Sequence, residues 1–196
     1  MTCSVELRAA RIPGLGLIAD HYWFVITRQS HRYRWEVWQN KNAGGISWTH
    51  IHQNLKPPCE GVGNGPSWLV QRWQRDKADA LIQTIENTPK CYPYRDHYFY
   101  WPGPNSNTYV QWILHKAGID FSLGPTAIGK DYLGIIGSHQ GANSYQVSTP
   151  VLGFKWQPSK SFEAQLLSFC FGLRLKPLRC IYPGQRQSQA NHKEHR

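Results

Sequence analysis

The chain has 196 residues, a length that suits one domain with a substantial buried core. Only 17% of the residues are charged, and nine tryptophans and ten tyrosines supply large apolar side chains, which excludes an intrinsically disordered protein. The formal net charge of +10 predicts a surface that attracts anions, but it bears on solubility and loose association rather than on fold.

The cysteines and the N-terminus exclude further classes. The five cysteines are scattered and odd in number, and no pair has metal-ligand spacing, so a disulfide framework is not expected. Residues 12–19 form an apolar run too short, and too interrupted by Pro13 and Gly14, for a signal core or a membrane span. We therefore expect a cytoplasmic protein with reduced thiols, no membrane span and no cofactor.

The N-terminal part predicts three strands. They cover residues 4–12, 21–27 and 33–39, with a hairpin connection at 29–32. Because side chains alternate across a sheet, a loop of two or four residues places His21 and Glu36 on one face, either opposite or diagonal to each other. A shift of one residue would separate them.

The middle of the chain carries two histidines on a short predicted strand at 47–55. His50 and His52 are either half of a metal site or hydrogen-bonded histidines, and we expect no metal because no third ligand has suitable spacing. The chain then predicts a Pro/Gly-rich loop at 56–67, a strand or helix lead-in at 68–73, and a helix from about Ala78 to Thr88–Pro89.

A second helix is predicted after the Pro/Gly-rich start of the stretch 101–112, with apolar residues at 110, 113, 114 and 117. Ser106 lies where this helix begins, and unpaired backbone N–H groups and the helix dipole stabilise negative charge there. Ser106 is therefore either a nucleophile or part of a helix cap, since Thr108–Gln111 matches a capping box.

The remaining chain predicts mainly strands. After a loop at 127–132, in which Lys130 either holds an anion or pairs with Asp131, and a polar loop at 137–143, the strands cover 145–156, 162–175 and 178–182. Residues 184–196 are polar and basic and predict a disordered tail. The whole pattern predicts one α+β domain over residues 1–183, an antiparallel sheet packed with two main helices.

Four motifs resemble a mainly bacterial domain-of-unknown-function family, number 3750. They are His-Tyr-Trp-Phe-Val at 21–25, Tyr-Pro-Tyr-Arg at 92–95, Trp-Pro-Gly-Pro-Asn-Ser-Asn-Thr-Tyr at 101–109 and Ala-Ile-Gly-Lys-Asp-Tyr at 127–132. The resemblance covers roughly residues 4–183 and brings no established activity.

The order of three polar residues resembles circularly permuted papain-like enzymes of the NlpC/P60 and lecithin:retinol acyltransferase type. That resemblance implies their architecture, with His21 as base, Glu36 as its orienting partner and Ser106 at the position of the family's cysteine. Serine departs from the pattern, because its hydroxyl stays protonated at neutral pH and must lose its proton to a base during attack. Glu36 can equally pair with Arg34.

We therefore expect a hydrolase or acyltransferase that acts through an acyl-Ser106 intermediate on a small-molecule, peptide or acyl substrate. Candidate oxyanion or substrate-binding residues are Asn105, Asn107, Thr108, Lys130, Tyr94 and Trp101, although the aromatic residues can equally fill the core. The alternative is a catalytically inactive binding module in the same cleft. Nucleic-acid binding ranks third, because the sequence has no RRM, KH or zinc-finger signature. The sequence does not predict the oligomeric state.

Overall fold

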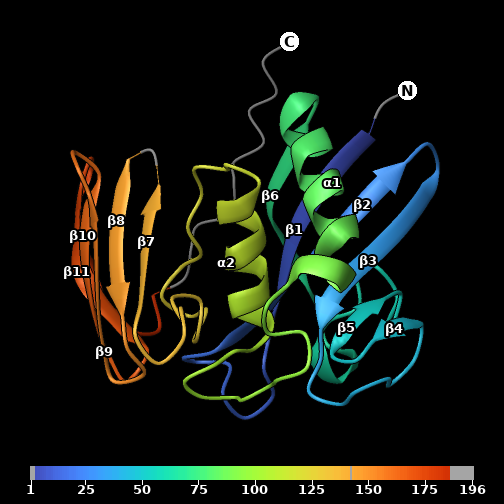
Figure 1. Cartoon of the computed structure of the whole chain (residues 1–196), viewed down its shortest axis with the longest axis horizontal. Coiled ribbons are helices and arrows are strands. Elements are labelled where there is room, and N and C mark those ends of the chain that lie inside the picture. Colours follow the sequence, from blue (N-terminus) through green and yellow to red (C-terminus); the bar gives the residue numbers. More distant parts are fainter. Residues whose placement is uncertain (1–2, 142, 186–196) are drawn as a thin grey trace.

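Two antiparallel sheets dominate the computed structural model, which describes residues 3–141 and 143–185 (Figure 1). The first sheet has the strand order β4-β5-β3-β2-β1-β6. Its strands are β1 (Cys3–Arg11), β2 (Asp20–Arg28), β3 (His31–Val37), β4 (Ile46–Trp48), β5 (Ile51–Gln53) and β6 (Trp68–Gln74). The second sheet is a meander of β7 (Gly137–Gly141), β8 (Ser144–Ser148), β9 (Leu152–Gln157), β10 (Ser161–Leu166), β11 (Phe169–Leu175) and β12 (Leu178–Ile181).

The expected α+β class is wrong, because the described part of the chain is mainly β. It contains two α-helices, α1 (Asp76–Cys91) and α2 (Ser106–Lys116), and a short 3-10 helix at Val62–Asn64, against twelve strands in two sheets rather than one. The papain-like architecture is likewise not confirmed. The three N-terminal strands, the strand at 68–73 and both helices are confirmed.

The error arose in the C-terminal part of the chain. The segments 145–156 and 162–175 were expected as two strands, but each folds back on itself as a hairpin, and the expected loop 137–143 contains β7. Leu167 and Ser168, at the β10–β11 turn, have φ values of 51° and 63°. Such a turn is usually signalled by Asn-Gly or Asp-Gly, and Leu-Ser gives no such signal.

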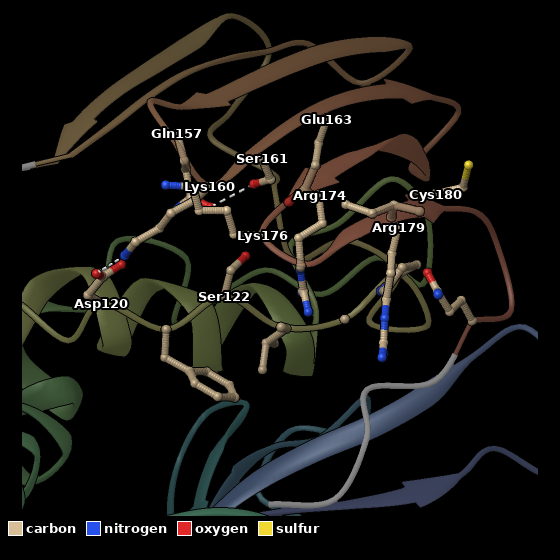
Figure 2. A pocket seen from close by; sticks show the side chains of 16 residues that line it. Asp120, Ser122, Gln157, Lys160, Ser161, Glu163, Arg174, Lys176, Arg179 and Cys180 are labelled. Atoms are coloured by element: carbon tan, nitrogen blue, oxygen red, sulfur yellow. Dashed lines mark hydrogen bonds and ion pairs between the residues drawn. The ribbon is translucent and has the colours of Figure 1, made fainter.

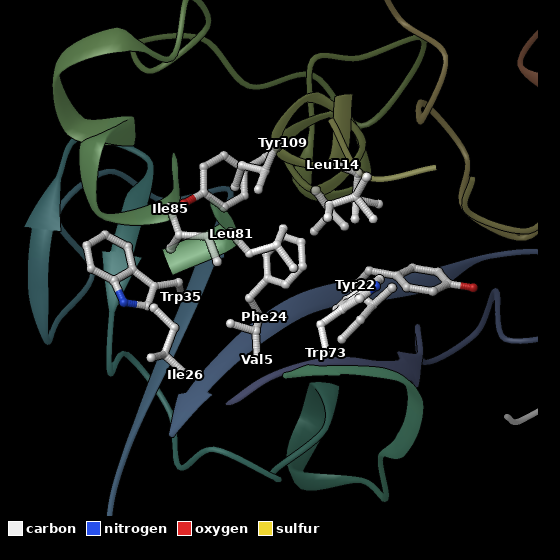
Figure 3. Close-up of a cluster of buried hydrophobic side chains, with 14 of the residues drawn as sticks. Val5, Tyr22, Phe24, Ile26, Trp35, Trp73, Leu81, Ile85, Tyr109 and Leu114 are labelled. Carbon is white, nitrogen blue, oxygen red and sulfur yellow. The ribbon is translucent and has the colours of Figure 1, made fainter. Parts of the chain in front are cut away.

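The main hydrophobic core lies between the first sheet and the two helices, which cover one face of that sheet (Figure 1). Figure 3 shows Leu81 and Ile85 of α1 and Tyr109 of α2 near the sheet residues Phe24 and Trp35. All five side chains are almost completely buried. Burial of each such side chain stabilises the fold by about 1.5–3 kcal/mol, so this layer fixes α2 against β2 and β3.

Helix α1 continues two residues past Pro89, although it was expected to end near Thr88–Pro89. Proline has no N–H to donate to the carbonyl four residues earlier, which here is that of Ile85. The Thr88 hydroxyl donates to that carbonyl at 2.7 Å, and it also lies 3.0 Å from the hydroxyl of Tyr109 on α2. Thr88 thereby compensates for the proline and joins the two helices.

The second sheet stands at one end of the molecule, beside α2 and the loops that follow it (Figure 1). Most of the buried side chains of its inner face are polar, whereas the large side chains of its outer face are apolar and exposed. The buried side chains include Gln146, Lys155, Glu163 and Gln165, and the exposed ones include Phe154 and Trp156. This inverted alternation is the opposite of what a sheet packed on a hydrophobic core shows.

Among the described residues, no helix has the length and apolar character needed to cross a membrane. The cytoplasmic location stays a prediction. So does the division into a domain at 1–183 and a basic tail at 184–196, and residues 186–196 of that tail lie outside the described residues.

Candidate active site

The hairpin of β2 and β3 places His21 and Glu36 on one face of the first sheet. Arg28 pairs with His31 across the two-residue turn, and the same register pairs Phe24 with Trp35. Extended by further pairs, this register places His21 diagonal to Glu36, which is one of the two arrangements expected from the sequence. The edge of the Trp38 indole packs against the His21 ring, with centroids 5.5 Å apart.

Three polar side chains from distant parts of the sequence form a hydrogen-bonded relay. His21 Nδ1 lies 2.9 Å from Ser106 Oγ, and His21 Nε2 lies 2.9 Å from Glu36 Oε2. All three side chains are buried, with Ser106 and His21 each 4% exposed and Glu36 completely inaccessible. The structure therefore brings together the three residues that the sequence singled out as nucleophile, base and orienting acid.

The ionisation state of Glu36 determines which ring nitrogen of His21 carries the hydrogen in this relay. Burial by itself would raise the pKa of Glu36, but the hydrogen bond from His21 and the positive charge of Arg34 outweigh it and hold the pKa below the ordinary value of 4.5. Glu36 is thus an ionised carboxylate at neutral pH and can only accept hydrogen bonds. His21 Nε2 must carry the proton that it donates, so in the neutral ring Nδ1 accepts from the Ser106 hydroxyl.

Arg34 extends the relay by one member, because it donates to the same carboxylate oxygen of Glu36 that His21 contacts. It was expected as an alternative to His21 as the partner of Glu36, but both side chains are completely buried and Glu36 binds Arg34 and His21 together. Arg34 Nη2 donates to Glu36 Oε2 at 2.7 Å, and its guanidinium carbon lies 4.1 Å from the centre of the Trp23 ring. The spacing of Arg34 and Glu36 at i and i+2 on one strand was the available signal.

The Pro/Gly-rich loop at 56–67 covers this charged face of the sheet. Arg34 donates to the backbone carbonyls of Pro57 and Glu60, and the indole N–H of Trp23 donates to the carbonyl of Pro58. These bonds satisfy a cation that would be very costly to bury alone. The loop therefore shields the Arg34–Glu36 pair from water.

Helix α2 begins at Ser106 because Asn105 caps it. The Asn105 Oδ1 accepts from the N–H groups of Asn107 and Thr108, and the Thr108 hydroxyl accepts from the Asn105 N–H, which completes a capping box. The box thus spans Asn105–Thr108 and not Thr108–Gln111 as expected. The side-chain oxygen of Gln111 instead accepts from the N–H of Leu123.

The motif at 127–132 holds the capping segment in place. Asn105 Nδ2 and Asn107 Nδ2 both donate to the carbonyl of Ile128, and the Thr108 hydroxyl donates to the carbonyl of Gly129 at 2.6 Å. Gly129 has a φ of +83°, and a Cβ there would lie 2.3 Å from Asn105 Nδ2. The close approach of the two motifs therefore requires glycine at this position.

Asn107 also connects this segment to β2, because its Nδ2 donates to the carbonyl of Asp20, the residue before His21. These bonds occupy the side-chain donors of Asn105 and Asn107, which were expected as oxyanion or substrate-binding groups. Ser106's own N–H is the donor of the first turn that the Asn105 side chain does not use. The Ser106 N–H, rather than the Asn105 or Asn107 side chain, is therefore the donor at this helix start that could face a negatively charged group.

The other expected binding residues lie apart from the relay. The Lys130 ammonium is buried and pairs with Asp131 and, at 3.3 Å, with Glu163 of the second sheet. Burial by itself would lower the pKa of Lys130, but the two carboxylates raise it above the ordinary value. The Tyr94 ring packs edge-on against Tyr132, and the half-exposed Trp101 donates its indole N–H to the carbonyl of Leu167 at 3.0 Å.

Of the two histidines on the predicted strand at 47–55, His50 precedes β5 and His52 lies within it. His50 Nδ1 lies 2.9 Å from the carbonyl of Trp38, and His52 lies near the Ser47 hydroxyl at 3.0 Å. The single strand expected here is a hairpin of β4 and β5. Within the described ranges, no group of three or more His, Cys, Asp or Glu side chains could hold a metal ion.

Two sizeable cavities lie elsewhere in the molecule. One of about 470 Å³ and another of about 220 Å³ are lined by residues of the loop 118–125 and of the second sheet, and no member of the relay lines either. A space of about 10 Å³ adjoins Gly129 and Pro102, next to the capping segment. None of these three spaces is lined by Ser106, His21 or Glu36, whose side chains are buried.

Comparison with known proteins identifies a family. The family model described as a protein of unknown function (DUF3750) matches residues 2–132. The match spans the first sheet, both helices and all four relay residues, but it ends before the second sheet, whereas the resemblance was expected to extend to about residue 183. No curated protein and no solved structure matches the chain.

Proposed function

The chain belongs to the DUF3750 family of proteins of unknown function, and we propose that it is a hydrolase or acyltransferase in which Ser106 is the nucleophile. His21 is the general base and Glu36 the acid that orients it, while Arg34 holds Glu36 in position. The substrate class is an amide, ester or thioester, whose acyl group passes to Ser106. The observation that carries this proposal is the continuous relay of hydrogen bonds at 2.9, 2.9 and 2.7 Å from Ser106 to Arg34.

The chemistry follows from the hydrogen positions. As Ser106 Oγ attacks the carbonyl carbon, its proton passes to His21 Nδ1, and the imidazolium that forms is stabilised by the Glu36 carboxylate. The developing oxyanion lies at the N-terminus of α2, where the helix dipole and the Ser106 N–H favour negative charge. His21 then gives its proton to the leaving group, and a water or an acceptor nucleophile releases the acyl group from Ser106 by the same path in reverse.

A second candidate is a catalytically inactive member of the family, in which the relay only fixes the capping segment to the sheet. The observation that favours it is the 4% exposure of both Ser106 and His21. Buried polar side chains are normally hydrogen-bonded, so a relay of this kind is also what a purely structural role requires. The two candidates differ in whether Ser106 reacts.

Labelling by a fluorophosphonate probe, read by mass spectrometry of the native protein, separates these candidates. We expect modification of Ser106, its loss in His21→Gln, and its retention in His115→Gln, a matched control at the opposite end of α2. Ser148→Ala, which removes another buried serine, should also leave labelling unchanged. Absence of labelling at Ser106 with fluorophosphonates of several sizes would refute the catalytic proposal.

The variant Ser106→Cys tests whether His21 acts as a base. A thiol at the start of α2 beside His21 should ionise at lower pH than an ordinary cysteine, as thiols next to histidine and helix N-termini do. Alkylation by iodoacetamide as a function of pH measures this, with the exposed Cys91 as the internal control. An alkylation profile of the introduced thiol that matches that of Cys91, or that does not change on adding His21→Gln, would contradict a working base.

A further inference from the structure

The cavity of about 470 Å³ lies between the loop 120–125 and the inner face of the second sheet, and no relay residue lines it (Figure 2). Four basic side chains line it, Lys160, Arg174, Lys176 and Arg179, with the acidic Asp120 and Glu163. Both acids are already engaged, because Asp120 pairs with Lys160 and Glu163 pairs with Lys130. Within residues 3–141 and 143–185, Arg174, Lys176 and Arg179 have no ion-pair partner.

The two arginines are held side by side by the sheet. Arg174 of β11 and Arg179 of β12 are directly opposite each other in the antiparallel register. Figure 2 shows both side chains extending in the same direction, from the sheet towards the loop that carries Ser122. Like charges directly opposite on neighbouring strands repel and destabilise a sheet. The repulsion between the two arginines therefore lowers the stability of the sheet. An anion bound between the two guanidinium groups would remove this repulsion.

We propose that this cavity binds a small ligand that carries a multiply charged oxyanion, such as a phosphate or a polycarboxylate. Two guanidinium groups offer planar pairs of N–H donors that match the oxygen atoms of these anions, and Lys176 adds a third positive charge. Phe121, Leu123 and Ile181 also line the cavity and would contact an apolar part of the ligand. This proposal does not depend on the reactivity of Ser106.

Isothermal titration calorimetry with inorganic pyrophosphate and with citrate, at fixed ionic strength, tests the site. Comparing the two ligands shows whether the cavity binds phosphates or polycarboxylates. We expect saturable binding of at least one of them to the whole protein. Arg174→Gln and Arg179→Gln should each weaken it about ten- to a hundredfold, because each removes hydrogen bonds between charged groups. Arg28→Gln, which removes an exposed arginine paired with Glu86, is the matched control and should bind normally.

Each outcome decides the proposal. Without ligand, Arg174→Gln and Arg179→Gln should unfold at a temperature equal to or above that of the wild type, since each relieves the repulsion between the arginines. No saturable binding of either anion to the wild type would overturn the proposal, whatever the variants do. So would an equal loss in Arg28→Gln, or binding of a single-stranded oligonucleotide alone, which would indicate a nucleic-acid surface instead.

The outer face of the second sheet carries an independent inference. Its exposed side chains alternate with the buried polar ones, and each is 37–71% exposed: Tyr145, Val147, Leu152, Phe154, Trp156, Phe162, Leu166, Phe171, Leu173, Leu175 and Leu178. The register of β8 to β12 places them all on one face, which contains no Asp, Glu, Lys or Arg. We call this set the outer apolar face.

The outer apolar face has the size of a specific interface. A large side chain exposed to about half its extent offers roughly 80 Å², since a whole aromatic side chain accounts for about 150–250 Å². The set therefore offers roughly 900 Å², above the largest apolar patch of a typical monomer at about 300–600 Å². It also matches the area of about 800 Å² that each partner contributes to a stable complex.

We infer that the outer apolar face packs against the same face of a second copy of this chain. A two-fold axis brings a face against itself, which an uncharged face permits without repulsion and without burying a charge. Two twisted sheets can then pack face to face as a sandwich. The sequence of residues 186–196 contains one apolar residue, Ala190, so this segment lacks the apolar side chains needed to pack against the outer apolar face.

Sedimentation velocity and light scattering of the whole protein test this dimer. We expect a dimer at micromolar concentration, a monomer for Trp156→Lys, and a dimer for the control Leu17→Lys, which adds the same charge at a leucine that is 82% exposed outside the second sheet. A wild type that remains monomeric up to the highest soluble concentration overturns the inference. Flotation of a monomeric wild type with phosphatidylcholine vesicles would instead assign the outer apolar face to a membrane surface.

Discussion

Replacing Glu36 with Gln tests the electrostatic basis of the relay most directly. The substitution keeps the shape of the side chain but removes the carboxylate that Arg34 and His21 share. Arg34 is completely buried, so its charge would be left without a counter-ion in a region from which water is excluded. Removing one member of a buried ion pair costs about 3–5 kcal/mol, and we expect Glu36→Gln to lower the free energy of unfolding by that amount.

Urea unfolding followed by tryptophan fluorescence measures this loss. The matched control is Glu86→Gln, which breaks the Arg28–Glu86 pair, whose side chains are 45% and 39% exposed. Exposed pairs contribute about 0–1 kcal/mol, so the control should change the free energy of unfolding little. If Glu36→Gln costs no more than Glu86→Gln, then the pair does not carry the buried charge interaction that the relay requires.

The same variant predicts a pH dependence. Because the pKa of Glu36 is lower in the folded protein than its ordinary value of 4.5, the unfolded chain binds this proton more readily. The stabilisation from this carboxylate is therefore complete above about pH 4.5 and is lost as the pH falls through the lowered value. Glu36→Gln lacks this titration, so its deficit relative to the wild type should shrink below about pH 4.5. A deficit that stays constant down to about pH 3 would contradict the lowered pKa.

Three further substitutions test how the relay is positioned, each by urea unfolding. Asn105→Ala removes the cap of α2 and should cost about 1–2 kcal/mol, and a cost below about 0.5 kcal/mol would contradict the capping role. Gly129→Ala should destabilise by more than about 1 kcal/mol, because its φ is +83° and its Cβ would meet Asn105, so an unchanged midpoint would count against the close approach. Thr88→Val should cost about 1–3 kcal/mol by leaving the Ile85 carbonyl and the Tyr109 hydroxyl unpaired, and a neutral effect would show that they find other partners.

The shared face of His21 and Glu36 and the start of α2 at Ser106 were accessible from sequence because they depend on local rules, whereas the grouping of Ser106 with the other two residues was expected from the resemblance to permuted papain-like enzymes. The β2–β3 register follows from a short turn between two strands with β-branched and aromatic residues, and the start of α2 follows from polar residues before an amphipathic segment. The burial of Arg34 was not accessible in this way. It depends on the loop 56–67 folding over the charged face, and that loop has no periodic pattern from which its path could be predicted.

The orientation of the strands in the second sheet could not be predicted from the sequence for a different physical reason. Alternation of apolar and polar residues predicts a half-buried strand, but it does not say which set faces inward. In β10 the side chains of Ser161, Glu163 and Gln165 are buried, while Phe162 and Leu166 are exposed. The sequence pattern does not decide between the two orientations, which depend on the partner across the interface.

That partner is Lys130, and it accounts for the inverted sheet. Its ammonium is buried and remains charged because Asp131 and Glu163 surround it. A buried cation requires acidic and polar neighbours, so the inward position of the second sheet that contacts Lys130 must be acidic or polar, as Glu163 is. Because side chains alternate strictly along a strand, the same requirement turns the intervening apolar positions, such as Phe162, outward. The ion pair between Lys130 and Glu163 therefore joins the loop that supports Ser106 to the second sheet, and by fixing Glu163 inward it turns its neighbour Phe162 towards the outer apolar face.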